Sequence, residues 1–122
     1  FVAEFIGSPK MNIIKINKEQ IINSNTIELF KNKITFENFE FKDEIYLGIR
    51  PEDISLENNH EIQVDVKIDH VENLGFEKIV YSKVLENQII IKTSKNINNH
   101  SLKISFSKDK ILFFDKDKNR IR

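Results

Sequence analysis

Apolar and polar residues alternate along much of the chain, in short runs that are separated by turn residues. The clearest run covers residues 62–68, where Ile62, Val64, Val66 and Ile68 alternate with polar side chains. Because successive side chains of a strand point to opposite faces, this run predicts a strand with one buried and one solvent-facing side. Similar patterns predict strands at residues 11–16, 27–29, 34–36, 45–49, 79–84, 89–93, 102–106 and 111–114.

The spacing of these strands indicates the fold class. Strands recur about every 8–12 residues with turn signals between them, which is typical of a small barrel or sandwich. Polar residues 31–33 separate one pair of strands and residues 86–87 another, so both pairs are predicted to be hairpins. Pro51 ends the strand at 45–49, because proline has no N–H to donate to the ladder. The fold is therefore predicted to be all-β.

The first residues have a different pattern. Residues 1–6 have the apolar spacing of a last helical turn, Gly7 can take the left-handed cap conformation, and Pro9 prevents continuation. Six residues cannot hold a helix alone. Since the chain also begins on Phe1 rather than Met, we expect the helix to start upstream, in a longer protein.

Composition supports the strand prediction and removes several function classes. Ile, Val and Thr together account for 30 of the 122 residues, whereas Ala occurs once. The 19 Lys and Arg residues balance 19 Asp and Glu residues, which disfavours a nucleic-acid partner. The absence of Cys excludes a disulfide framework, a thiolate zinc site and a cysteine nucleophile. No apolar run approaches the roughly 20 residues of a membrane-spanning helix.

The residues that usually carry chemistry do not form a recognisable site. His60, His70 and His100 are too far apart in sequence to form a ligand pair, so they are interpreted as ordinary surface residues. The only glycines are Gly7, Gly48 and Gly75. With so few, neither a dinucleotide-binding turn nor a P-loop can be written. No pair of carboxylates has the apolar surroundings that would raise one pKa for acid–base catalysis. We therefore expect no catalytic, cofactor-binding or metal-ligating residues in this chain.

Arg50 is the one side chain that composition does not explain. The chain uses 16 Lys against 3 Arg, and Arg50 is the only Arg before the tail. A planar guanidinium is needed where a carboxylate or carbonyl is bound through two hydrogen bonds. A structural or interfacial contact is favoured over a ligand site, because no pocket signature accompanies Arg50.

Four segments match motifs that occur together in one family. The first motif, F-V-A-x-F-I-G-S-P-x-M-N, is matched by Phe1, Val2, Ala3, Phe5, Ile6, Gly7, Ser8, Pro9, Met11 and Asn12. The second, L-G-I-R-P-E, stands unchanged and supplies Gly48, Arg50, Pro51 and Glu52. The third, V-x-x-L-G-x-E, is matched by Val71, Leu74, Gly75 and Glu77, with Phe76 at its variable position. The fourth is the strand 111–115, where Ile-Leu-Phe-Phe replaces the usual His-Leu-Phe.

In order and separation these motifs resemble the C-terminal part of the ATPase subunits of carbohydrate-importing ABC transporters, of the maltose and glycerol-3-phosphate importer type. The resemblance implies two interlocked OB-fold-like small barrels (a TOBE domain) that exchange terminal strands and follow the end of a linker helix. It divides the chain into residues 1–9, the end of the linker helix, and 10–122, the regulatory domain. Within that domain it implies a first barrel at about 10–56, a second at about 57–110 and a returning strand at 111–122.

The same resemblance implies a non-catalytic regulatory and dimerisation domain. The Walker and signature motifs, with ATP and Mg²⁺, are expected only in an ATPase domain upstream, so the full-length subunit is expected to be a transport ATPase. Expected partners are a second copy of the chain, the transporter's membrane subunits and a regulatory protein, and the expected location is the cytoplasmic face of the membrane. Interface candidates are Phe5, Met11, Arg50 and Phe76, with core packing an equal alternative for Phe5, Met11 and Phe76.

Two other function classes stay open at this point. One is a module that binds a small ligand, an oxyanion or a sugar, and regulates transport. The other is single-stranded nucleic-acid binding by the barrel, which the neutral charge disfavours. Residues 14–44 and 87–110 match no motif, which leaves a partner surface there open.

Overall fold

The computed structural model describes residues 10–121, and its regular elements in that range are β-strands and single 3₁₀ turns. The strands are β1 (Asn12–Ile16), β2 (Ile21–Asn23), β3 (Thr26–Leu29), β4 (Asn32–Thr35), β5 (Ile45–Ile49), β6 (Ile62–Asn73), β7 (Lys78–Val84), β8 (Asn87–Thr93), β9 (Ser101–Phe106), β10 (Leu112–Phe114) and β11 (Arg120–Ile121). The 3₁₀ turns are η2 (Lys18–Gln20), η3 (Pro51–Asp53) and η4 (Lys108–Lys110). The all-β prediction is confirmed. The predicted helix end at residues 1–9, with Phe5, Gly7, Ser8 and Pro9, lies outside the described residues.

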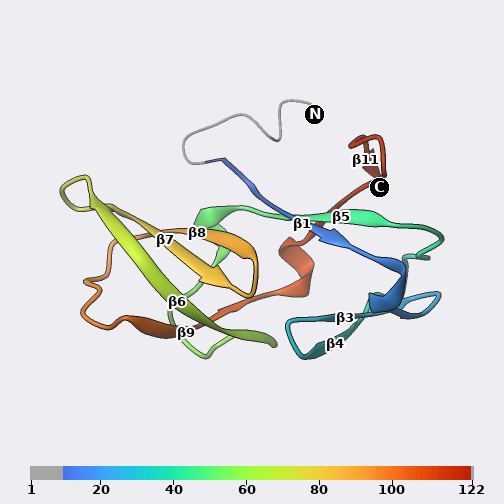
Figure 1. Cartoon of the computed structure of the whole chain (residues 1–122), viewed down its shortest axis with the longest axis horizontal. Helices are drawn as coiled ribbons and strands as arrows, with labels where there is room; N and C mark the ends of the chain where they lie inside the picture. Colours follow the sequence, from blue (N-terminus) through green and yellow to red (C-terminus); the bar gives the residue numbers. More distant parts are fainter. Residues whose placement is uncertain (1–9, 122) are drawn as a thin grey trace.

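The strands form three antiparallel sheets arranged in two halves (Figure 1). One half contains the sheet β1-β5-β10-β11 and the small sheet β2-β3-β4, and the other contains β8-β7-β6-β9. Strand β10 comes from the end of the chain but pairs with β5, so that Phe113 lies opposite Leu47. The last two strands, β10 and β11, thus lie in the same sheet as the first strand, β1. None of the three sheets closes into a full barrel.

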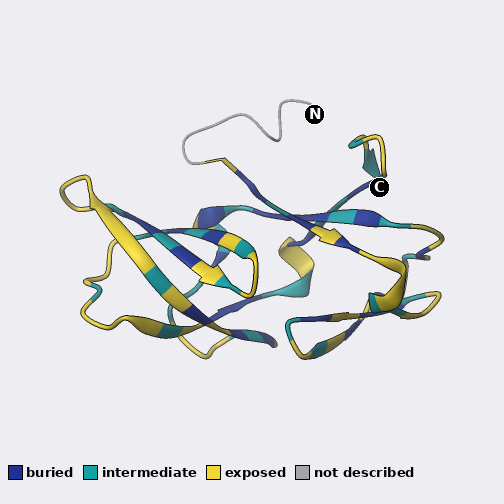
Figure 2. Ribbon diagram, in the orientation of Figure 1, coloured by how far each residue is buried: buried dark blue, intermediate teal, exposed yellow. Residues whose placement is uncertain are grey.

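A single hydrophobic core connects the two halves. It includes Ile14 of β1 and Leu47 of β5, and it continues through Val64 of β6 to Ile91 of β8. The alternation predicted for β6 is present where the strand crosses the core, because Ile62, Val64 and Val66 are buried and the residues between them are not (Figure 2). Burial of one face by apolar residues thus explains why these runs form strands.

Strand β6 continues beyond the predicted end at Ile68. A shift of register between Ile68 and His70 marks a β-bulge, after which β6 pairs with β7 as far as Asn73. The residues in this extension are mostly polar and exposed, so the sequence there lacks the alternation of apolar and polar residues that predicts a strand. Strands β2 and β11 were not predicted for a similar reason, since they are short and contain no buried residue.

Four phenylalanines fill the space beside the first half. The ring of Phe113 stacks on Phe39 at 4.1 Å between centroids and meets Phe36 edge-on at 4.9 Å. Phe41 also contacts Phe113, at 5.7 Å. Phe39 and Phe41 alternate with Glu40, as apolar and polar residues do in a strand, but this segment is irregular in the structure. The aromatic rings hold an irregular segment against the core.

Candidate functional site

Residues from three of the motifs meet around Gly48, in a cluster that we call the motif junction (Met11, Gly48 and Phe114). Strand β5 contains Gly48, with β1 on one side and β10 on the other. A Cβ atom on Gly48 would lie 2.5 Å from Met11 Sδ and 2.8 Å from Phe114 Cε2. Glycine at this position leaves room for both side chains to cross the strand. Met11 is only 8% exposed, so it packs within this chain rather than on its surface.

Asn12 connects β1 to the other half of the molecule. Its side-chain amide Nδ2 donates to the carbonyl of Ile90 at 2.8 Å, and its Oδ1 accepts from the Ile90 N–H at 2.7 Å. Ile90 lies in β8, which is an edge strand, and Asn12 is 4% exposed. The amide therefore satisfies both backbone groups of an edge residue, as a neighbouring strand would.

The R-P-E part of the second motif forms the short turn η3 after β5. Pro51 is buried at the first position of the turn, where its missing N–H costs nothing, and the turn packs against β8. Arg50 is partly exposed and Glu52 exposed. Within residues 10–121 neither side chain makes a hydrogen bond or ion pair, so the bidentate contact predicted for Arg50 is not present there.

The third motif forms the turn between β6 and β7. Gly75 has a φ of 96°, a conformation that suits glycine, and the Asn73 side chain accepts a hydrogen bond from its N–H at 3.0 Å. Phe76 beside it is 84% exposed and Leu74 is 55% exposed, so core packing is the wrong interpretation for Phe76. Val71, near the end of β6, is a third exposed apolar residue close in sequence, and we call these three residues the hairpin tip. An exposed apolar group of this kind is the usual mark of a contact surface.

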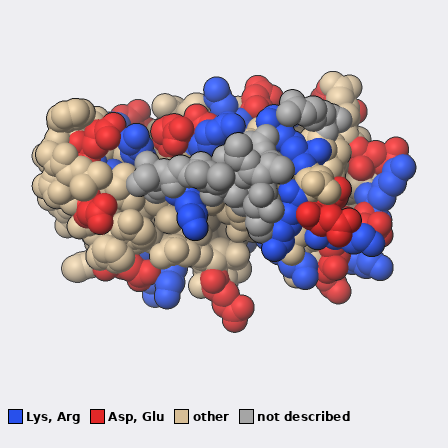
Figure 3. Space-filling model, turned by 90° about the horizontal axis from the view of Figure 1, so that it is seen from above, with Lys and Arg blue, Asp and Glu red and all other residues tan. Residues whose placement is uncertain are grey.

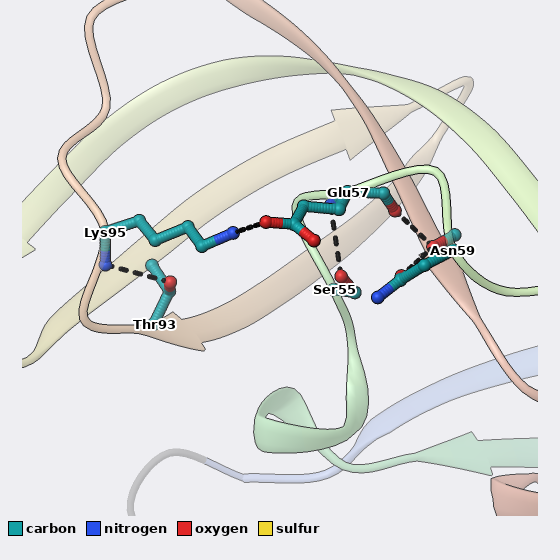
Figure 4. Close-up of polar contacts among 6 residues, drawn as sticks. Ser55, Glu57, Asn59, Thr93 and Lys95 are labelled. Carbon is teal, nitrogen blue, oxygen red and sulfur yellow. Dashed lines mark hydrogen bonds and ion pairs between the residues drawn. The ribbon is translucent and has the colours of Figure 1, made fainter.

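The densest group of polar contacts lies where the loop after η3 crosses β9 (Figure 4). Ser55 and Ser105 exchange two backbone hydrogen bonds, at 2.8 and 2.9 Å. The buried Ser105 hydroxyl donates to the carbonyl of Glu57. The Glu57 carboxylate pairs with Lys95, whose hydrogen bond and charge lower the pKa of Glu57. These contacts fasten a loop to the sheet, and the lowered pKa of Glu57 is the opposite of what a catalytic acid needs.

Comparison with known proteins places these features in a family. No family model matches the chain. It is 31% identical over 134 residues to the oligosaccharides import ATP-binding protein MsmX of Bacillus subtilis, covering 96% of this chain and 36% of MsmX. It is 38% identical over 87 residues to the maltose/maltodextrin import ATP-binding protein MalK of Aliivibrio fischeri, covering 66% of this chain and 24% of MalK. The chain is homologous to ATP-binding subunits of sugar-importing ABC transporters.

A third relative extends the match. The uncharacterised ABC transporter ATP-binding protein YcjV of Escherichia coli O157:H7 is 31% identical over 123 residues, or 94% of this chain and 34% of YcjV. The chain spans about a quarter to a third of the length of these subunits. The resemblance drawn from the motifs is thereby confirmed. No helix within residues 10–121 is long and apolar enough to span a membrane.

The three histidines form no metal site within the described residues. His70 stacks on Tyr81 across the β6–β7 pair, at 4.3 Å between ring centroids. His60 lies in the irregular segment before β6, and His100 precedes β9, with its carbonyl accepting a hydrogen bond from the Ile68 N–H at 2.7 Å. Among the described residues, no three His, Asp or Glu side chains are placed to hold a metal ion. Positive and negative side chains both occur over the face drawn in Figure 3.

A small pocket of about 360 Å³ lies between the segment before β5 and the turn after β10. Its charged lining residues are Glu40, Lys42, Asp43, Glu44, Asp115, Lys116 and Asp117. Five carboxylates against two ammonium groups give this pocket a negative charge. An oxyanion would be repelled there.

Glu61 supplies a pH-dependent contact. Its carboxylate accepts a hydrogen bond from the backbone N–H of Lys108 at 2.6 Å, which lowers the pKa of Glu61. A lowered pKa contributes stability above the unfolded value of about 4.3, and this contribution is lost as the pH falls through the folded pKa. Because Glu61 is exposed, the contribution is expected to stay below about 1 kcal/mol.

We predict that Glu61→Gln reduces the loss of stability between neutral and acidic pH. The amide keeps an acceptor for the Lys108 N–H but removes the titrating charge. Urea denaturation of both proteins at pH 7 and at about pH 3.5, below the reference pKa of Glu, measures the difference. Glu86→Gln, at an exposed turn position, is the control. An identical acid sensitivity of Glu61→Gln and the unaltered chain would contradict the assignment.

Proposed function

We propose that this chain is a non-catalytic regulatory and dimerisation domain of an ATP-binding subunit of an ABC sugar importer. The observation that carries the proposal is the match of 96% of this chain to only 36% of MsmX. A piece of that size, built from strands and with only three glycines, suits an accessory domain rather than the nucleotide-binding one. In this proposal ATP and Mg²⁺ are bound by another domain of the whole protein, which acts as the transport ATPase.

The proposed role needs a rigid body and a self-complementary surface, but no reacting groups. A contact that persists while other parts of an assembly move is best made between strand-rich bodies of fixed shape. The two halves share one core and are further joined by Asn12 and by the returning β10, which supports such rigidity. The whole protein would work on the cytoplasmic face of the membrane with the transporter's membrane subunits and, as a further partner, a regulatory protein.

The hairpin tip is the surface that we assign to the contact with a second copy. Phe76 is 84% exposed and gains little from folding, whereas burial of a Phe side chain at an interface contributes about 1.5–3 kcal/mol. Aromatic residues are also enriched at the centres of interfaces. In a symmetric dimer each such residue contributes twice.

We predict that Phe76→Ser weakens self-association of the chain at least about tenfold, which corresponds to about 1.4 kcal/mol. Sedimentation equilibrium over a wide range of protein concentration measures the dimer constant. Ile22→Ser is the matched control, because Ile22 is also an exposed apolar residue but lies in the other half. A chain that stays monomeric at all concentrations would contradict the dimerisation role. Equal effects of the two substitutions would remove the assignment to the hairpin tip.

The small-ligand alternative receives less support. The acidic lining of the pocket near β5 opposes the binding of molybdate, sulfate or phosphate. Thermal-shift measurements with these anions and with maltose distinguish the two functions. A rise in the melting temperature with one ligand alone would favour the binding module, and no response leaves the dimerisation proposal in first place.

A further inference from the structure

The first half of β6 has a strand partner on only one side. Residues 62–66 pair with β9, whereas pairing with β7 begins only at Lys67. Within residues 10–121 no strand pairs with 62–66 on the side that faces away from β9. Each half of β6 thus has a strand partner on one side only, and residues 62–66 present an open edge on the side away from β9.

The hydrogen bonds around the edge show which backbone groups it presents. Ser105, opposite Gln63, uses its N–H and C=O to bond Ser55, so these two groups point away from β6. Gln63 and Ser105 are thus a non-hydrogen-bonded pair, and the Gln63 N–H and C=O point away from β9. By the two-residue period of a strand, the N–H and C=O of Asp65 point the same way.

Only one of these four groups has a partner in the described chain. The Asn32 side chain donates to the Gln63 carbonyl at 2.9 Å. No hydrogen bond within residues 10–121 is found for the Gln63 N–H or for the N–H and C=O of Asp65. The edge of β8 differs, since Asn12 bonds both groups of Ile90 there. The β6 edge is therefore left open to another strand.

The open edge lies along a groove of about 1060 Å³. The β7–β8 turn, with Val84 and Leu85, borders one side, and the β3–β4 turn, with Phe30 and Asn32, borders the other. Figure 1 shows both turns directed toward the start of β6. The groove thus combines unpaired backbone groups with a few apolar side chains, Phe30, Val84 and Leu85 among them, as sites that bind an added strand do.

The two bordering turns contain unusual backbone conformations. The φ angles are 49° at Phe30, 71° at Lys31 and 55° at Leu85. Asn and Gly adopt such angles most easily, and the chain contains 14 Asn, yet these turns use other residues there. Leu85 is also 83% exposed, so its side chain adds nothing to the core. A strained, exposed leucine at the mouth of a groove indicates a role in binding.

The charged residues that line the groove restrict which segment can bind there. On the β6 side the charged lining residues are Asp65, Lys67, Asp69, Lys83 and Lys103, with a net charge of +1. On the opposite side they are Glu19, Glu28 and Lys31, with a net charge of −1. An occupant with one acidic and one basic side chain on its outer face complements both walls.

We propose that this groove binds an extended peptide segment of another protein as an additional strand, antiparallel to β6. Its inner side chains are apolar and contact Phe30, Val84 and Leu85. Its outer side chains are polar and include both charges. The N–H and C=O groups of its outward-facing residues bond to Gln63 and Asp65. This surface is separate from the hairpin tip and does not depend on the proposed dimerisation.

The test uses the peptide acetyl-Glu-Val-Thr-Val-Lys-amide and the ¹⁵N-labelled chain. Titration monitored by NMR is expected to shift the amide signals of Gln63 and Asp65 and to slow their hydrogen exchange. N-methylation of the central Thr removes an N–H that faces β6 and is expected to weaken binding at least about tenfold. N-methylation of a neighbouring Val removes an N–H that faces away, so the affinity is expected to change little.

The variant Leu85→Asn tests whether a loss of peptide binding can occur without a loss of stability. In Leu85→Asn the new residue suits the left-handed conformation, so the melting temperature is expected to rise while the affinity for the peptide falls severalfold. Three results would each overturn the proposal. They are the absence of shifts at Gln63 and Asp65 up to roughly 1 mM peptide, equal effects of the two N-methylations, and a Leu85→Asn variant that binds as tightly as the unaltered chain.

Discussion

Replacement of Gly48 by alanine is expected to lower the free energy of unfolding by about 2–3 kcal/mol, in the upper range for overpacking a core. The new Cβ would lie 2.5 Å from Met11 Sδ and 2.8 Å from Phe114 Cε2. The Met11 side chain is flexible and can move, but Phe114 is fully buried and cannot. Alanine restricts the unfolded chain more than glycine, which offsets only about 0.4–1 kcal/mol of the loss.

A double-mutant cycle distinguishes this clash from a general loss of stability. Met11→Ala opens space beside Gly48, so Met11→Ala together with Gly48→Ala should cost less than the sum of the two single substitutions. Urea denaturation of the three variants measures the coupling. A cost below about 0.5 kcal/mol for Gly48→Ala would show that β5 can shift away and that glycine is not required there.

The strand-rich body could be predicted from the sequence because it depends on local patterns. Ile62, Val64 and Val66 alternate with polar residues in a period that only a half-buried strand explains. Glycine and proline marked the places where β5 ends and where the β6–β7 turn lies. The family motifs located these positions correctly, and the structure adds that several of the motif residues have packing roles, Met11 and Gly48 among them.

The contacts between distant segments could not be predicted. Asn12 and Ile90 are 78 residues apart, and nothing in the sequence near Ile90 distinguishes it from Ile89 or Ile91. The open edge of β6 depends on where β7 ends, because pairing stops at Lys67 opposite Lys83 and the chain turns away after Val84. The two hairpins were predicted, but the left-handed conformations of Phe30 and Leu85 in their turns run against the preferences of these residue types and could not be. Such features arise from tertiary packing and overrule local propensity.

Asn12 is the residue whose replacement should best reveal how the two halves are joined. In Asn12→Ala the N–H and C=O of Ile90 lose their partner in a partly buried place, which is expected to cost about 2 kcal/mol. Asn12→Asp is expected to cost more at pH 7, about 3 kcal/mol, because a buried carboxylate would face the Ile90 carbonyl without a donor between them. Asn98→Asp, at an exposed position, is the control and is expected to stay within about 0.5 kcal/mol.

The cost of Asn12→Asp should depend on pH in a defined direction. Burial and the Ile90 carbonyl would raise the pKa of the new carboxyl in the folded state above its unfolded value of about 3.9. Below that pH the neutral acid can donate to the Ile90 carbonyl and accept from the N–H, as the amide does, so the variant should approach the unaltered chain. As the pH rises above about 3.9, the difference in stability should grow by up to about 1.4 kcal/mol per unit until the folded pKa is reached. Urea denaturation from about pH 3.5 to pH 7 measures this difference. If Asn12→Asp lowers the free energy of unfolding equally at the lowest and the highest pH, then water, rather than Asn12, can satisfy the N–H and C=O of Ile90 at the edge of β8.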